Sequence, residues 1–65
     1  LPPTEAAAAA GERAARKVFA RGGSVESAAT EAGRAASLMG MARGLSIAES
    51  AGVAQQACAA VTGGD

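Results

Sequence analysis

Apolar residues recur in steps of three and four along much of the chain, which is the spacing of one face of a helix. The pattern is clearest in the middle third, where it contains Val25, Ala28, Ala32, Ala35, Met39 and Ala42. Ser24 precedes this run as a candidate helix cap, and Gly44 follows it as a candidate stop. The spacing therefore predicts a helix over residues 25–43. A second set of small residues recurs every four positions, so another side of this helix is nearly smooth: Ala29, Gly33 and Ser37, with Ala36, Gly40 and Gly44.

A first helix is predicted over residues 5–21. Thr4 can accept a hydrogen bond from a free amide of the first turn, and the negative charge of Glu5 suits the positive end of a helix. The segment ends at Gly22 and Gly23, which can adopt the left-handed conformation common after a helix.

The third helix has the clearest start signal of the chain. The segment Ser46-Ile47-Ala48-Glu49 matches a capping box, in which the serine and glutamate side chains each satisfy an amide of the first turn. The signal and the apolar spacing behind it predict a helix over residues 47–61. A narrow apolar seam of the kind that meets another helix is formed by Ile47, Ala51, Ala54, Cys58 and Val61.

The connections between these helices are only two or three residues long, which favours antiparallel neighbours. The sequence thus predicts an all-α chain of three short alanine-rich helices with tight turns of glycine and serine. It forms one small helical unit over residues 1–65 without separate domains, in a hairpin-like or an extended arrangement. The first residue is Leu1 rather than methionine, which suggests a processed or partial product.

Composition limits how this unit can be stabilised. Twenty of the 65 residues are alanine, and ten side chains after Leu1 are large and apolar. Small domains with so little core usually need a disulfide, a metal or a partner. Cys58 is the single cysteine and histidine is absent, so the chain favours a partner: a larger protein, or copies of itself.

Charge gives the chain no overall attraction for anions, because six basic and six acidic residues cancel. Four basic residues nevertheless share one face of the first helix: Arg13, Arg16, Lys17 and Arg21. This stripe is best interpreted as a solvated face, and alternatively as a contact for an acidic protein surface, phosphates or anionic lipid. Nucleic acid is the least favoured of these partners, because the chain lacks tyrosine and tryptophan for base stacking.

Catalysis is not expected from this sequence. Histidine is absent, and the helical neighbours of Cys58 provide neither a base nor a charge that would activate its thiol. Cys58 is best interpreted as a small buried apolar residue, with an intermolecular disulfide or a thioether to a cofactor as alternatives. The sequence predicts no cofactor and no metal site.

The leading hypothesis is a non-catalytic structural, accessory or linker subunit of a larger protein assembly. Its partner contacts are predicted at Phe19, Val25, Met39, Ile47, Val53, Cys58 and Val61. The alternative is a free-standing secreted or membrane-active helical peptide that meets lipid with its basic face. No apolar run is long enough to predict a membrane-spanning helix, and the sequence does not indicate a compartment.

Overall fold

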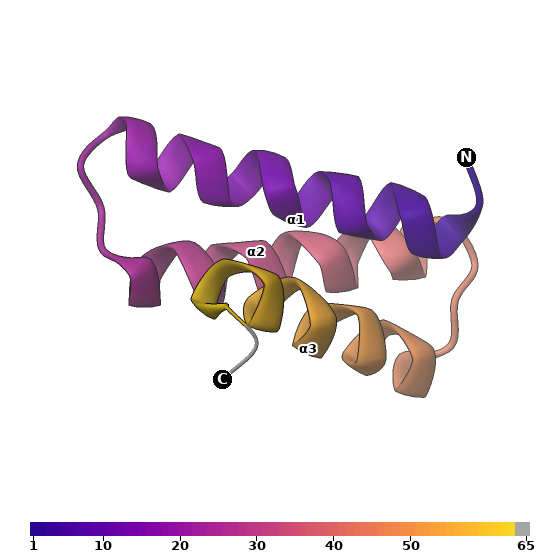
Figure 1. Cartoon of the computed structure of the whole chain (residues 1–65). Coiled ribbons are helices and arrows are strands. Elements are labelled where there is room, and N and C mark those ends of the chain that lie inside the picture. Colours follow the sequence, from indigo (N-terminus) through magenta and orange to yellow (C-terminus); the bar gives the residue numbers. More distant parts are fainter. Residues whose placement is uncertain (64–65) are drawn as a thin grey trace.

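The chain forms the three predicted helices, α1 (Pro3–Ala20), α2 (Val25–Ala42) and α3 (Ile47–Thr62). They are seen in a computed structural model that describes residues 1–63. Each helix runs antiparallel to the one before it, as the short connections predict (Figure 1).

Local hydrogen bonds set the starts of α2 and α3. The hydroxyl of Ser24 accepts from the backbone N–H of Ser27 at 3.0 Å. The predicted capping box is present at α3: the N–H of Glu49 donates to the Ser46 hydroxyl at 3.1 Å, and the N–H of Ser46 donates to a Glu49 carboxylate oxygen at 2.9 Å. These bonds satisfy amides that a helix end otherwise leaves free.

The start of α1 differs from the prediction. The helix begins at Pro3, and Thr4 lies inside its first turn instead of capping it. Pro2 occupies the cap position without a side-chain hydrogen bond. Proline is well accepted in the first turn of a helix, because its missing N–H would have no partner there.

The helices are packed against one another, so the extended arrangement considered from the sequence is wrong. The Cα radius of gyration is 10.7 Å, close to the value of about 11 Å expected for a folded domain of this length. α2 is central: it packs along α1 on one side and along α3 on the other, whereas α1 and α3 share a smaller contact. Figure 1 shows α3 crossing the pair formed by α1 and α2.

The core is built mainly from alanine methyl groups. Val18 of α1 and Val53 of α3 are its only two large side chains among the described residues, and the others are Ala7, Ala15, Ala28, Ala32, Ala36 and Ala57. Leu45 and Val61 pack against this cluster from its edge. Thin side chains fill a core only if the helix axes lie close together.

Glycines inside the helices provide that close approach. A Cβ atom at Gly11 of α1 would lie 2.9 Å from the carbonyl oxygen of Ala32 in α2 and 3.0 Å from the Cβ of Ala57 in α3. A Cβ atom at Gly33 of α2 would lie 2.8 Å from the sulfur of Cys58 in α3. At Gly11 the backbones of α1 and α2 therefore approach closely, and α3 places only the small side chains of Ala57 and Cys58 against the two glycines.

The buried faces of α2 and α3 are rotated from those suggested by the apolar pattern. α2 turns its smooth side inward, burying Ala28, Ala29, Ala32, Gly33, Ala36 and Gly40. α3 buries Ser50, Val53 and Ala57, while Ile47 and Ala51 of the predicted seam are exposed. In α2, close packing selects the face with the smallest side chains, although Val25 and Met39 lie on another side.

Candidate partner-binding grooves

Few of the large apolar side chains lie in the core of the molecule. Of the ten identified in the sequence, Val18 and Val53 alone are buried. Five are exposed: Phe19, Val25, Leu38, Met41 and Ile47. The chain therefore keeps alanine inside and presents larger apolar groups to its surroundings, which is the reverse of the usual preference.

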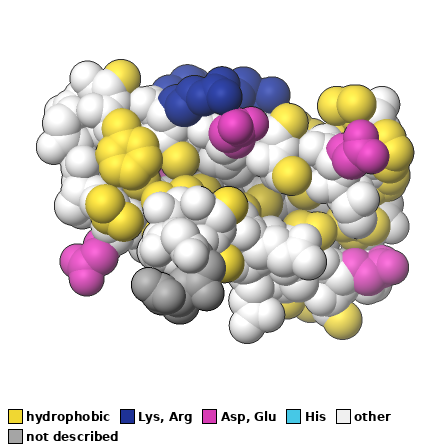
Figure 2. Space-filling model, viewed as in Figure 1, with side chains coloured by type: hydrophobic (Ala, Val, Ile, Leu, Met, Phe, Trp, Pro, Cys, Tyr) yellow, Lys and Arg dark blue, Asp and Glu magenta, His cyan; other side chains and the backbone are white. Residues whose placement is uncertain are grey.

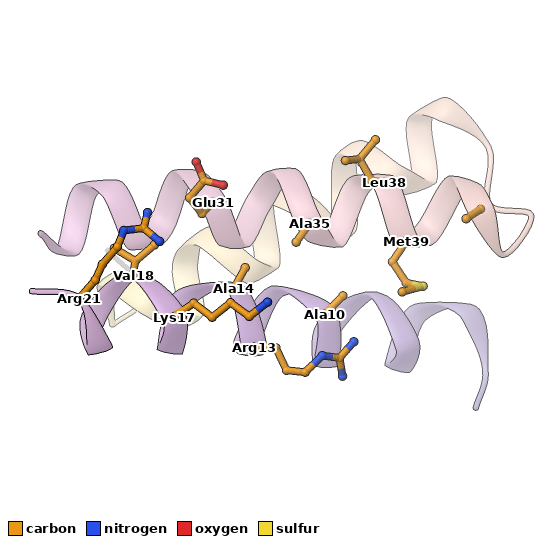
Figure 3. A pocket seen from close by; sticks show the side chains of 11 residues that line it. Ala10, Arg13, Ala14, Lys17, Val18, Arg21, Glu31, Ala35, Leu38 and Met39 are labelled. Carbon is orange, nitrogen blue, oxygen red and sulfur yellow. The ribbon is translucent and has the colours of Figure 1, made fainter. Parts of the chain in front are cut away.

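A groove of about 580 Å³ runs between α1 and α2, and we call it the basic groove. It is lined by Ala10, Arg13, Ala14, Lys17 and Val18 of α1 with Arg21 directly after that helix, and by Glu31, Ala35, Leu38, Met39 and Ala42 of α2. Figure 3 shows this face with α3 behind the two helices, so the groove lies on the opposite side of the pair from α3.

The basic groove has a small-residue floor and two chemically different sides. The methyl groups of Ala10, Ala14 and Ala35 lie between the helices (Figure 3). Cationic side chains follow the α1 side, whereas Leu38 stands on the α2 side and is 58% exposed. There is room for large apolar side chains of another molecule over these alanines. The cationic side chains on the α1 side lie next to that space.

The predicted basic stripe is divided between two surfaces. Arg13, Lys17 and Arg21 line the basic groove, one helical turn apart. Arg16 points to the other side of α1, where its guanidinium lies 3.1 Å from the carboxylate of Glu12. Both side chains of that pair are largely exposed, so the pair contributes little to stability.

A second groove, of about 650 Å³, lies between α1 and α3, and we call it the apolar groove. Its walls are Thr4, Glu5, Ala8, Ala9, Glu12, Ala15, Arg16 and Phe19 of α1, with Val53, Gln56, Ala57, Ala60 and Val61 of α3. Hydrophobic atoms follow the junction of the two helices in Figure 2. Its charged residues are Glu5, Glu12 and Arg16, whereas the basic groove has three cations and a single acid, Glu31.

The two grooves contain four of the seven predicted contact residues. Met39 lines the basic groove. Phe19, Val61 and Val53 line the apolar groove, but Val53 is buried in the chain's own core and offers a partner little surface. Phe19 is the largest exposed group there, with 46% of its surface accessible.

The other three predicted contacts lie outside both grooves. Val25 and Ile47 are exposed at the first turns of α2 and α3. Cys58 is half-buried, and its thiol donates a hydrogen bond to the carbonyl oxygen of Ala29 at 3.1 Å. Its sulfur occupies space that the missing side chain of Gly33 leaves open, so Cys58 serves the packing of α3 on α2.

Sequence reasoning placed Ala35, Met39 and Ala42 on one apolar face of α2, but it missed Glu31 and Leu38 and did not pair this face with α1. Glu31, Ala35, Leu38 and Ala42 follow a four-three-four spacing, as do Ala10, Ala14, Lys17 and Arg21 on α1. These matched stripes were the available signal. Each is weakly apolar, so neither stands out by hydrophobicity alone.

Residues 1–63 contain no group of three or more cysteine, histidine or acidic residues placed to hold a metal ion. No helix in this part of the chain is long and apolar enough to cross a membrane. The hydroxyl of Ser50 is buried without a hydrogen-bond partner, but it lines none of the grooves described.

Comparison with known proteins finds no matching family model, no matching curated protein and no matching solved structure. Function is therefore inferred from the chain's own surface. Its most distinctive features are the two grooves that flank α1 and the large apolar side chains that lie outside the core.

Proposed function

We propose that the chain is a non-catalytic accessory or linker subunit that binds a larger protein assembly through the surfaces flanking α1. The observation that carries this proposal is the inverted placement of apolar groups, with alanine inside and Phe19, Leu38 and Met41 outside. Exposed apolar groups beside grooves are typical of protein-binding surfaces. Covering them with a partner adds the apolar burial that the thin core lacks.

The shape of the grooves supports a helical or otherwise protruding partner element. Alanine lines the floor of each groove, so a larger side chain of the partner can insert between the two helices that form the groove. Knobs of this kind inserted between small residues are the ordinary way in which helices pack together. A partner helix in either groove would extend the three-helix unit to a four-helix arrangement.

A membrane-active peptide remains the second candidate, and its support is the position of Leu38 beside three cationic side chains. An amphipathic membrane helix buries a protruding apolar face. The alanine floor of the basic groove is instead recessed between two helices, which disfavours contact with a flat bilayer.

The native mass of the chain tests the accessory-subunit proposal. An epitope-tagged copy expressed at natural levels is released under mild conditions and separated by size. We expect it to elute well above its own mass of 6.2 kDa, in a complex of fixed composition. Elution of the wild-type chain at its own mass would contradict the proposal.

Substitutions in each groove test whether the complex depends on that groove. Leu38→Asp alters the basic groove, and Phe19→Asp alters the apolar groove. Ala48→Asp is the matched control, because Ala48 is exposed, lines neither groove and is not among the predicted contacts. We expect at least one groove variant to leave the complex while the control stays in it, with all three retaining the helical circular dichroism of the wild type.

A further inference from the structure

We infer that the basic groove receives an acidic amphipathic helix of the partner protein, about three turns long. This inference rests on the proposed function and specifies the chemistry of one partner surface. It is drawn from the charge, depth and length of the groove between α1 and α2.

Charge is the first argument. Arg13, Lys17 and Arg21 place positive charge at three successive turns of one wall. Among residues 1–63 the sole ion pair joins Glu12 and Arg16, so these three cations have no acidic partner within ion-pair distance there. A partner helix with carboxylates at every third or fourth position would match the spacing of these three cations.

The charge is strongest toward the Arg13 end. Arg21 borders a small hollow that also contains Glu26 and Glu31, which reduces its field. Glu31 stands on the α2 wall across the groove from the Arg21 end (Figure 3). The carboxylates of the partner helix should therefore lie near Arg13 and Lys17, with a neutral or basic residue near Glu31, and this asymmetry sets the direction of the helix.

Depth is the second argument. Ala10, Ala14 and Ala35 form a recessed floor, Met39 extends from α2 toward α1 near Ala10, and Leu38 points away from α1 on the α2 side. Large apolar side chains on one stripe of the partner helix would fill the recess, while its acidic stripe faces α1. The stem of Lys17 is also apolar and adds contact area beneath its charge.

Length is the third argument. The α1 wall extends from Ala10 to Arg21, which is about 17 Å at about 1.5 Å per residue. A helix of roughly twelve residues covers this distance. An anionic bilayer or a nucleic acid would also be attracted by the cations, but neither has apolar side chains that reach the alanine floor.

The native complex provides the first test. Arg13→Glu combined with Lys17→Glu reverses the charge of the wall, and Arg34→Glu is the matched control on an exposed position of α2 outside the groove. We expect the double variant to leave the complex and the control to remain. A complex that survives the double variant but is lost with Phe19→Asp would overturn the basic-groove inference and leave the accessory-subunit proposal intact.

Two synthetic helices test the chemistry directly. The acidic probe has glutamate at every fourth position beside a stripe of leucine, and the control probe has lysine in place of each glutamate. Fluorescence anisotropy with the wild-type chain should show binding of the acidic probe alone, weakened by salt. The double charge reversal should reduce its affinity on the order of tenfold or more, and Arg34→Glu should leave it unchanged.

Three results would overturn the inference. The first is equal binding of the acidic and lysine probes, or no binding of the acidic probe. The second is stronger, Arg13- and Lys17-dependent binding to phosphatidylserine–phosphatidylcholine vesicles or to a mixed-sequence DNA duplex than to the acidic probe. The third is a native complex whose mass is a multiple of the chain's own mass, because a second copy would then be the partner.

Discussion

Gly11 lies where α1 meets both other helices. Glycine weakens a helix by its low propensity, but here its missing side chain allows the helices to pack closely. Its hydrogen atom faces the Ala32 carbonyl oxygen, where a Cβ would be 2.9 Å away. Gly52 in the middle of α3 has no atom within 4 Å of a Cβ placed on it. The two glycines therefore have equal helix propensity but opposite tolerance of a methyl group.

We predict that Gly11→Ala lowers the free energy of unfolding by about 1–3 kcal/mol, because backbone atoms of α2 must move. Gly52→Ala should raise it by about 0.5–1 kcal/mol, because alanine has the higher helix propensity. Urea titration followed by circular dichroism measures both. Equal effects of the two substitutions would contradict the close packing at Gly11.

A pair of valines tests the inverted placement of apolar residues. Val18 is 1% exposed in the core, whereas Val25 is 51% exposed at the start of α2. Val18→Ala should cost about 2 kcal/mol of unfolding free energy through lost burial and the cavity it leaves. Val25→Ala should change it by less than about 0.5 kcal/mol. The arrangement would be wrong if Val25→Ala proved the more damaging substitution.

At the scale of the elements, the ends of α2 and α3 could be predicted to within one residue, because each is set by a few neighbouring residues. Gly22 and Gly44 adopt φ values of +81° and +97°, a conformation that favours glycine after a helix. The start of α1 was displaced by two residues, because two consecutive prolines and Thr4 offer competing start signals. Such local chemistry can be read without knowing the rest of the fold.

The buried faces could not be predicted in the same way. An alanine-rich helix has apolar groups on every side, so the spacing of Val25 and Met39 competes with the smooth stripe of Gly33 and Ala36. The choice depends on how closely a second helix can approach, which is a property of two helices together. The same limitation hid the basic groove, whose walls come from separate helices, and the burial of Ser50.

The capping box of α3 gives a prediction about pH. Hydrogen bonds to Glu49 from the backbone N–H of Ser46, and to a lesser extent from its side chain, hold the pKa of the Glu49 carboxyl below its ordinary value of 4.5. The pKa of Glu49 is lower in the folded chain than in the unfolded chain. Its ionised carboxylate therefore stabilises α3 at pH values above the pKa of the unfolded chain. That stabilisation is lost as the pH falls through the lowered pKa.

Glu49→Gln isolates this effect, since glutamine still accepts from the N–H of Ser46 but does not ionise. We predict that the wild type is more stable than Glu49→Gln near neutral pH and that the difference shrinks toward about pH 3. Parallel urea titrations across this range measure it, and the other carboxylates are common to both proteins. A difference that grew on acidification would contradict the lowered pKa.

The whole molecule combines a well-defined three-helix architecture with a core of alanine and two valines. Its close helix approach gains contact area from backbone atoms, but alanine methyl groups remove little apolar surface from water. Small domains without a disulfide or metal have little stability to spare. On the proposed function, part of the stability of this fold comes from a partner that covers its exposed apolar groups.

The most direct test is urea unfolding of the isolated chain, followed by circular dichroism at two concentrations a hundredfold apart with a sedimentation mass at each. We predict an unfolding free energy below about 5 kcal/mol for the monomer, or helicity that increases as the chain associates. A cooperative, concentration-independent transition of a monomer with an unfolding free energy above about 5 kcal/mol would contradict it. The alanine core would then hold the fold without any partner.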